Sequence, residues 1–170
     1  MYKRQRSQFA RDLERRQDPL AELPMSTDRK YLANQVVLVG YGRVGRQISL
    51  ELLAQSVPFV VVDENRELVE RLRAEGRAAV FGDAAEPLTL VQAHLAEARL
   101  LVIATPQTVA VRRMVETART LNPAIEVVLR SHNSEEAALL ESEQAGKVFV
   151  GEQELARSMV AYVLARVAPG

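Results

Sequence analysis

Hydrophobic residues along the chain follow two spacings that alternate from residue 35 onward. Short, nearly unbroken apolar runs are separated by stretches in which apolar residues return every three or four positions. The runs are typical of parallel strands covered on both faces, and the longer stretches are typical of helices with one buried side. Strands are predicted at residues 36–39, 59–63, 78–82, 100–104, 125–130 and 147–150. Helices are predicted at residues 43–56, 67–75, 86–94, 106–121, 134–143 and 152–166.

This regular alternation predicts an α/β fold. We expect a Rossmann-like, doubly wound parallel sheet of six strands in the order 3-2-1-4-5-6, because crossovers between parallel strands are right-handed. The residues expected to face inward from the first helix are Val44, Ile48, Leu52 and Leu53. Those expected to face inward from the second helix are Leu68, Val69 and Leu72.

Residues 1–34 have a different character from the rest of the chain. They are rich in charged residues and glutamine, and Pro19 and Pro24 interrupt them. Such a segment has too few apolar residues to build a core, so it is predicted to be a charged linker or tail. We therefore expect a single folded domain over residues 35–167.

Composition and charge exclude several classes of function. The 170 residues include 22 Lys and Arg and 22 Asp and Glu, and this balance gives no general attraction to nucleic acid. The chain has no cysteine, and His94 and His132 lie far apart without ligand spacing, so we expect no metal site. No apolar run approaches the roughly 20 residues of a membrane span, so the chain is expected to be soluble, and the lack of cysteine is compatible with the cytosol.

A glycine-rich turn directly follows the first predicted strand and opens the first predicted helix. Its residues are Gly40, Tyr41, Gly42, Arg43, Val44 and Gly45. In a G-x-G-x-x-G turn the first glycine permits the tight turn, the second lets the backbone approach a phosphate, and the third lets the helix pack on the strand. The first amides of the helix would then face that phosphate. We therefore predict an adenine nucleotide here, the alternative being a tight turn without a ligand.

An acidic residue ends the second predicted strand, as a ribose-binding site requires. The carboxylate of Asp63 can accept hydrogen bonds from the ribose hydroxyls, and Glu64 beside it is assigned to the same site. A 2′-phosphate would be repelled there, which favours NAD or an adenosine nucleotide over NADP, although Arg66 nearby leaves that preference open. The alternative role for Asp63 is to cap the helix that follows it.

Five residues outside strand two, among them Arg43 of the glycine turn, are predicted to reach the same edge of the sheet. Asp83, with Ala84 beside it, follows the third strand and could meet the adenine or cap the next helix. Thr105, after the fourth strand, could touch ribose or phosphate or serve as an N-cap. Arg43 could pair with phosphate, and Arg130, at the end of the fifth strand, points to the same rim.

Together these motifs resemble the TrkA-N, or RCK, domain of Kef-type potassium/proton antiporters, the YbaL-like branch in particular. The segments that carry the resemblance are 36–45, 61–63, 81–85, 121–126, 146–152 and 155–156. The resemblance covers about residues 35–160. It implies a regulatory domain that binds AMP, NAD(H) or a similar adenine nucleotide such as ATP. The nucleotide would bias the geometry of a homodimer. That geometry would gate a monovalent cation:proton antiporter at the inner face of the cell membrane.

In this family the helix after the last strand commonly packs across to a second protomer. Here that helix would be 152–166. Its apolar stripe consists of Leu155, Met159, Val160, Val163 and Leu164. The alternative for the stripe is packing on its own sheet.

Two other functions compete with nucleotide sensing. An NAD-dependent oxidoreductase needs a region that holds the substrate and an acid or base near the nicotinamide, for which His132 is the candidate. A solvated loop histidine is the more frequent case, so we expect a domain that is not an enzyme. A dimerisation scaffold with a vestigial site would keep the sheet but lose the phosphate contacts, and the intact glycine turn with Asp63 argues against it.

Overall fold

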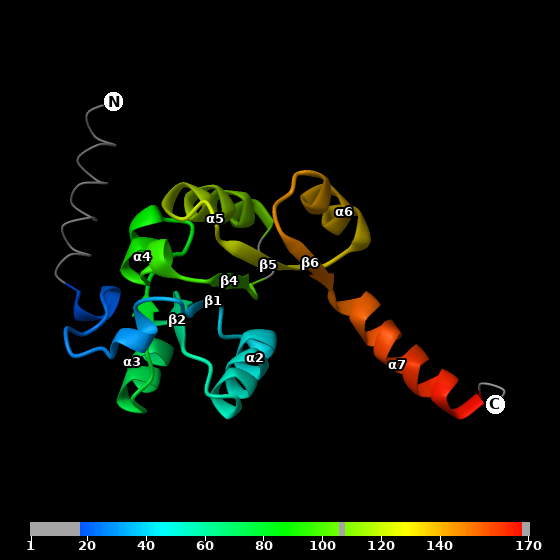
Figure 1. The fold of residues 1–170 in the computed structure, drawn as a ribbon, viewed down its shortest axis with the longest axis horizontal. Coiled ribbons are helices and arrows are strands. Elements are labelled where there is room, and N and C mark those ends of the chain that lie inside the picture. The colour runs from blue at the N-terminus through cyan, green and yellow to red at the C-terminus, as the bar shows by residue number, and fades with distance from the viewer. Residues whose placement is uncertain (1–17, 106–107, 168–170) are drawn as a thin grey trace.

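The computed structural model describes residues 18–105 and 108–167, and their strands form one parallel sheet in the order β3-β2-β1-β4-β5-β6 (Figure 1). The strands are β1 Val36–Val39, β2 Phe59–Asp63, β3 Ala79–Phe81, β4 Leu100–Ile103, β5 Glu126–Ser131 and β6 Lys147–Val150. The α-helices are α2 Arg43–Ala54, α3 Arg66–Ala74, α4 Pro87–Gln92, α5 Thr108–Leu121, α6 Ser134–Ser142 and α7 Gly151–Val167. Short 3₁₀ helices are η1 Pro19–Ala21, η2 Arg29–Tyr31 and η3 Leu95–Glu97. The predicted fold class and strand order are confirmed.

Helices cover both faces of the sheet, which explains why the strands have almost continuous apolar runs. Figure 1 shows α4, α5 and α6 on one face and α2 and α3 on the other. Alternate strand residues supply the two layers, with Val37 and Val39 in one core and Val36 and Leu38 in the other. Val37 and Leu38 are completely buried. Burial on both faces is what parallel sheets require.

The register of the strands brings their carboxyl ends to a common edge. Val39, the last residue of β1, pairs with Val62 of β2 and with Ile103 of β4. β1 therefore lies where the strand order reverses, and the loops that leave β1 and β4 diverge to opposite faces. Open α/β sheets bind ligands in the crevice at such a point.

The inward face of α3 is as predicted, but that of α2 is partly wrong. Ile48 and Leu52 are partly buried, whereas Val44 is 37% and Leu53 is 42% exposed. The fully buried residues of α2 are Gly45 and Ser49. Because Gly45 has no side chain, α2 comes closest to the sheet along the face of the glycine, and the two misassigned residues lie beside that face.

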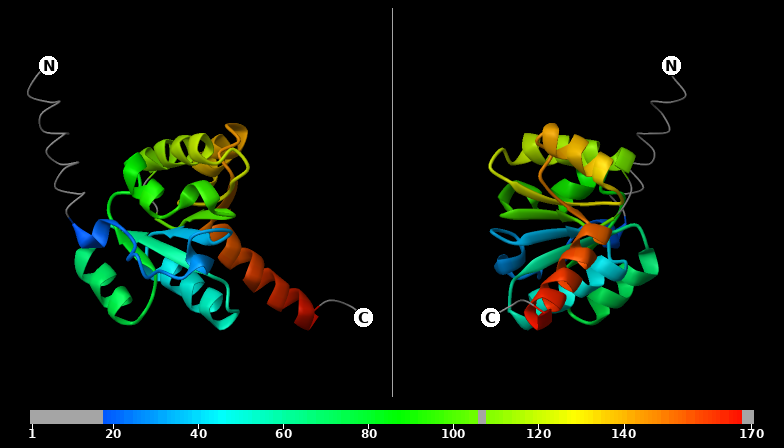
Figure 2. Two further views of the ribbon diagram at one scale, coloured as in Figure 1. Left: turned by 60° about the vertical axis from the view of Figure 1, so that its left-hand side comes forward. Right: turned by 90° about the vertical axis from the view of Figure 1, so that its right-hand side faces the viewer.

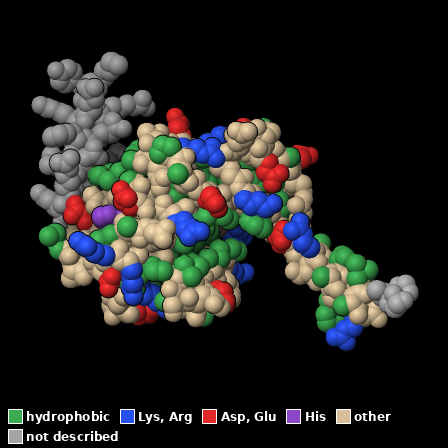
Figure 3. All heavy atoms as spheres, in the orientation of Figure 1, with side chains coloured by type: hydrophobic (Ala, Val, Ile, Leu, Met, Phe, Trp, Pro, Cys, Tyr) green, Lys and Arg blue, Asp and Glu red, His purple; other side chains and the backbone are tan. Residues whose placement is uncertain are grey.

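The last helix, α7, projects from the body of the domain (Figures 1 and 2). No residue of α7 is buried. The residues of the predicted apolar stripe are between 52% and 63% exposed, and Figure 3 shows apolar side chains along this helix. The alternative in which the stripe packs on its own sheet is therefore wrong for this chain.

The described part of the N-terminal segment lies along the free edge of β3. The 3₁₀ helix η1 contacts both β3 and α3. Leu20 packs against the core on the α2 and α3 side, and Leu23 and Tyr31 pack against the opposite core. Residues 1–17 of the predicted linker lie outside the described residues. Within 18–105 and 108–167, no helix combines the length and the apolar character needed to cross a membrane.

Candidate nucleotide-binding site

The glycine turn after β1 brings two backbone segments into very close contact. Gly40 has a φ of +92°, in the left-handed region that favours glycine. A Cβ built on Gly45 would lie only 1.9 Å from the carbonyl oxygen of Gly40. The first and third glycines therefore have the roles predicted for them, a tight turn and a close approach of helix to strand.

Gly42 is the N-cap of α2, and its surroundings leave room for an anion. No side chain caps the helix, so the first backbone amides of α2 have no side-chain acceptor. A Cβ added to Gly42 would meet no protein atom within 4 Å. The protein itself therefore does not require glycine at this position. A phosphate resting on the helix N-terminus would require it.

Asp63 connects the turn after β1 to the turn after β2. Its Oδ2 atom accepts a hydrogen bond of 2.9 Å from the backbone amide of Tyr41, and its Oδ1 atom accepts one of 2.8 Å from the amide of Asn65. The cap of α3 is the Asn65 side chain, which accepts from Leu68. The alternative in which Asp63 caps this helix is therefore wrong. Each carboxylate oxygen keeps a lone pair for a ribose hydroxyl.

The turn after β3 is organised around Asp83. Its Oδ1 atom accepts a hydrogen bond of 2.8 Å from the amide of Ala85, and the N-cap of α4 is Glu86 rather than Asp83. The helix-capping alternative for Asp83 is therefore wrong as well. Gly82 is packed so closely that an added Cβ would lie 2.7 Å from the hydroxyl of Thr89. Glycine at position 82 therefore lets this turn lie directly against Thr89 of α4.

Thr105 follows β4 and lies directly against the glycine turn. A Cβ on Gly40 would be 3.1 Å from the backbone nitrogen of Thr105. The described part of α5 begins at Thr108, and residues 106–107, which precede it, lie outside the described residues. Thr105 is partly buried at the junction of the two diverging loops.

A small cavity of about 160 Å³ joins these turns. The predicted residues that line it are Gly40, Asp63, Glu64, Asp83, Ala84 and Thr105. Its lining also includes Met114 of α5, which the sequence analysis missed because a methionine at helical spacing looks like an ordinary core residue. Small-molecule sites usually measure roughly 300–1,000 Å³, so this cavity can hold only part of a nucleotide and the rest would lie over the open glycine turn.

The remaining predicted residues lie around the rim. Arg43 and Val44 are exposed in the first turn of α2. Arg130 is partly buried at the end of β5, and its Nη1 donates a hydrogen bond of 3.3 Å to the carbonyl of Ala104. The backbone amide of Tyr41 donates to Asp63, and the hydroxyl of Tyr41 accepts a hydrogen bond of 3.0 Å from Arg77.

A second hollow of the described surface lacks a comparable arrangement. A hollow of about 510 Å³ lies between α5 and α6, but Arg112 and Glu143 on its wall form a bidentate ion pair with each other. Among the described residues no group of three or more His, Cys, Asp and Glu side chains could hold a metal ion. The edge with the glycine turn is therefore the best candidate site.

The parallel sheet, with its glycine turn where the strand order reverses, defines a Rossmann-type α/β domain. The family described as "TrkA-N domain" matches residues 36–151 of the chain. The chain therefore belongs to the TrkA-N domain family, and the resemblance stated from the sequence is confirmed.

Two similar proteins bear the names of antiporters. YbaL of Escherichia coli strain K12, named as a cation/proton antiporter, is 39% identical over 129 residues, which make up 76% of this chain and 23% of YbaL. KefB of Alkalimonas amylolytica, named as a K⁺ efflux antiporter, is 30% identical over 133 residues, or 78% of this chain and 20% of KefB. The chain thus spans about a fifth of the length of these relatives.

Solved structures share the fold. The crystal structure of the TrkA-N domain of the Escherichia coli inner membrane protein YbaL superposes with a TM-score of 0.72 at 38% identity, covering 76% of this chain and 96% of that one. The Shewanella denitrificans Kef CTD in its AMP-bound form has a TM-score of 0.67 at 23% identity, covering 81% and 83%. The GsuK channel bound to NAD has a TM-score of 0.63 at 24% identity, covering 84% and 25%.

Proposed function

We propose that this domain binds an adenine nucleotide, AMP or NAD(H), at the carboxyl edge of its sheet. The observation that carries the proposal is the pairing of an uncapped helix N-terminus at Gly42 with the carboxylate of Asp63 on the neighbouring turn. One end of this arrangement suits a phosphate and the other suits a ribose. The relatives with AMP and NAD in their names share the fold, which supports the same class of ligand.

Each part of the nucleotide has a matching part of the site. The phosphate would accept hydrogen bonds from the first amides of α2, with Arg43 beside it at the first helical position. The ribose would donate to Asp63 and Glu64, and the cavity lined by Asp83 and Ala84 would take the edge of the adenine. Thr105 would lie between ribose and phosphate.

The nucleotide would act as a signal rather than as a substrate. The similar proteins named above are transport proteins, and His132, the candidate acid or base of an oxidoreductase, lies exposed on the loop after β5. We therefore infer that the domain regulates a monovalent cation/proton antiporter, of the same chain or a separate one, from the cytoplasmic face of the membrane. The identity of the bound nucleotide would bias the conformation that the domain presents to the transporter.

A second copy of this chain is the partner that α7 fits. Its seven large apolar side chains, from Leu155 to Val167, are each at least half exposed. An apolar helix of this length held away from its own domain marks an interface, and a twofold homodimer lets each protomer cover the helix of the other. Nucleotide-dependent changes could then alter the angle between the two domains.

Isothermal titration with AMP, NAD⁺ and NADH tests the proposed function. We expect at least one of these nucleotides to bind, and we expect Asp63→Ala to weaken its binding by about tenfold or more, because hydrogen bonds to a charged group contribute about 1.5–3 kcal/mol. Thermal unfolding of the variant provides the control for folding. No binding by the folded wild-type chain would overturn the proposal, and unchanged affinity of the variant would remove the ribose assignment.

A further inference from the structure

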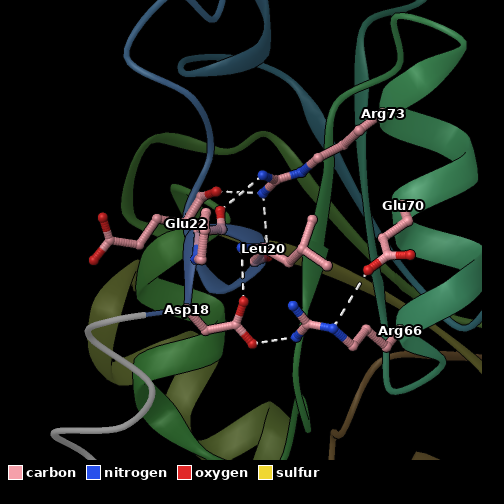
Figure 4. A network of polar contacts seen from close by, with 7 residues as sticks. Asp18, Leu20, Glu22, Arg66, Glu70 and Arg73 are labelled. Atoms are coloured by element: carbon pink, nitrogen blue, oxygen red, sulfur yellow. Dashed lines mark hydrogen bonds and ion pairs between the residues drawn. The ribbon is translucent and has the colours of Figure 1, made fainter.

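A short stretch of the N-terminal segment, residues 18–22, is fastened to the domain beside the ribose end of the site. We call it the docked segment. Arg73 of α3 donates from Nε to the carbonyl of Ala79 in β3 and from Nη1 to the carbonyl of Pro19, each at 2.8 Å. The same guanidinium donates to the carbonyls of Leu20 and Glu22 (Figure 4). One half-buried arginine therefore holds the segment to the edge of the sheet.

A second arginine, Arg66, contacts the docked segment through an acidic side chain. Its Nη1 atom donates to Oδ2 of Asp18, and its Nε lies 3.4 Å from Oε1 of Glu70. The other Asp18 oxygen accepts from the amide of Leu20 at 3.1 Å. Figure 4 shows the Glu22 carboxylate pointing away from both guanidinium groups. Asp18 thus pairs with Arg66, whereas the carboxylate of Glu22 points away from it.

Arg66 also lies near the acid assigned to the ribose along the chain. It is the first residue of α3, three positions after Asp63, and is the Lys or Arg nearest to Asp63 in the sequence. Its guanidinium lies over the ring of Phe81, 5.4 Å from the centroid, and Phe81 is the register partner of Asp63. Register partners of neighbouring strands point to the same face of the sheet. The cation therefore lies over the face of the sheet to which Asp63 points, within one strand of it.

A phosphate on the ribose 2′ position would need this cation. In Rossmann domains a nearby arginine accommodates the 2′-phosphate, and an acid in its place excludes that group. Here Arg66 is already shared between the carboxylates of Asp18 and Glu70. A 2′-phosphate arriving beside Asp63 would meet a guanidinium whose charge these two carboxylates already balance.

We propose that Asp18 is a specificity-determining residue, which engages Arg66 and thereby makes the site reject nucleotides that carry a 2′-phosphate. The inference rests on the proposed function and adds to it a link between the ligand and the N-terminal segment. A 2′-phosphate has to replace Asp18 as the partner of Arg66, and its binding therefore weakens the attachment of the docked segment. AMP and NAD(H) leave the pair intact. By linkage, release of the docked segment would favour 2′-phosphorylated ligands to the same extent.

Titration of the full chain with three ligands tests this proposal. The ligands are 5′-AMP, adenosine 2′,5′-bisphosphate and adenosine 3′,5′-bisphosphate, the last having the same charge as the second at a different position. We expect Asp18→Asn to bind the 2′,5′-bisphosphate about three- to fivefold more tightly than wild type, because an exposed ion pair contributes up to about 1 kcal/mol. The affinities for AMP and for the 3′,5′-bisphosphate should change by less than about twofold. Glu22→Gln, which removes a carboxylate of the same segment without touching Arg66, should change none of the three.

Two further variants and one structural readout sharpen the test. Adding Arg66→Gln to Asp18→Asn should abolish the gain, because the cation is then absent. Amide exchange at Leu20 and Ala21 should rise in the wild-type chain with the 2′,5′-bisphosphate and stay unchanged with AMP. Equal behaviour of Asp18→Asn and Glu22→Gln, with AMP binding intact, would overturn this inference alone. Absence of AMP, NAD⁺ and NADH binding in the wild-type chain and every variant would overturn the proposed function and this inference with it.

Discussion

Alanine substitutions at Gly42 and at Gly45 should have opposite consequences. The two positions belong to the same turn but differ in what an added Cβ would meet. At Gly45 the methyl group would lie 1.9 Å from the oxygen and 2.8 Å from the carbon of the Gly40 carbonyl. At Gly42 it would meet no protein atom within 4 Å. The same chemical change should therefore damage the fold at one position and only the ligand site at the other.

For Gly45→Ala, two opposing terms decide the magnitude. Alanine in place of glycine inside a helix favours folding by about 1 kcal/mol. The clash is with backbone rather than with a flexible side chain, so α2 has to move away from β1, and overpacking of this kind costs about 1–3 kcal/mol or more. Because the 1.9 Å approach places this clash at the severe end of that range, about 3 kcal/mol, we expect a net loss of about 2 kcal/mol in the free energy of unfolding. For a chain of this length that lowers the Tm by about 4–8 °C.

For Gly42→Ala, two opposing contributions to the free energy of unfolding should nearly cancel. Gly42 has φ −76° and ψ −158°, an extended conformation open to alanine. Alanine is a poorer N-cap by about 0.5–1 kcal/mol, and it restricts the unfolded chain by about 0.4–1 kcal/mol in the opposite direction. The methyl group would nevertheless occupy the space proposed for the phosphate, so AMP affinity should fall by about tenfold or more.

Thermal unfolding followed by circular dichroism, paired with isothermal titration of AMP, separates the two effects. The expected result is a lowered Tm with Gly45→Ala and a nearly unchanged Tm with weakened binding in Gly42→Ala. If Gly42→Ala binds AMP as tightly as the wild-type chain does, the phosphate does not rest on the N-terminus of α2. If Gly45→Ala keeps the wild-type Tm, the close contact in the turn does not constrain the fold.

Two further predictions concern α7 and the docked segment. Met159, on α7, is 61% exposed, so Met159→Glu should leave the Tm of the monomer unchanged. In analytical ultracentrifugation the variant should shift from dimer to monomer. A wild-type chain that is monomeric at high concentration would contradict this prediction. The hydrogen bond from Arg66 holds the pKa of Asp18 below its ordinary value of 3.8, so this pair stabilises the docked segment above that pH and is lost as the pH falls below it. The amide NMR resonance of Leu20 should report that loss at acidic pH, and a resonance insensitive to acid would count against it.

Most of the fold could be predicted because its signals are strong and local. The strands of a sheet buried on both faces have to be apolar throughout, and the inward residues Leu68, Val69 and Leu72 of α3 follow from helical spacing alone. The inward face of α2 was partly wrong for a physical reason. Apolar spacing cannot show that a helix approaches its sheet along a glycine, and Val44 and Leu53 remain exposed as a result.

The candidate site was predicted where backbone geometry demands particular residues, and missed where ordinary residues take part. Gly40 and Gly45 are required by the turn, and Asp63 ends a strand at the right edge. Met114 carries no signal that distinguishes it from a core residue. The contacts of Arg73 with backbone carbonyls of the docked segment depend on a chain path that a sequence rich in charge does not specify.

The two amide hydrogen bonds to Asp63 restrict how the ligand preference of such a domain can be changed. A carboxylate has two acceptor oxygens and no donor, and each oxygen of Asp63 already accepts one backbone amide, from Tyr41 and from Asn65. Asparagine would turn an N–H group toward one of these amides, and serine or glycine would leave at least one of them without its partner. Any engineering toward a phosphorylated ribose that replaces Asp63 therefore has to rebuild the two loops together, since neutralising this acid would disturb their alignment before any new nucleotide arrived.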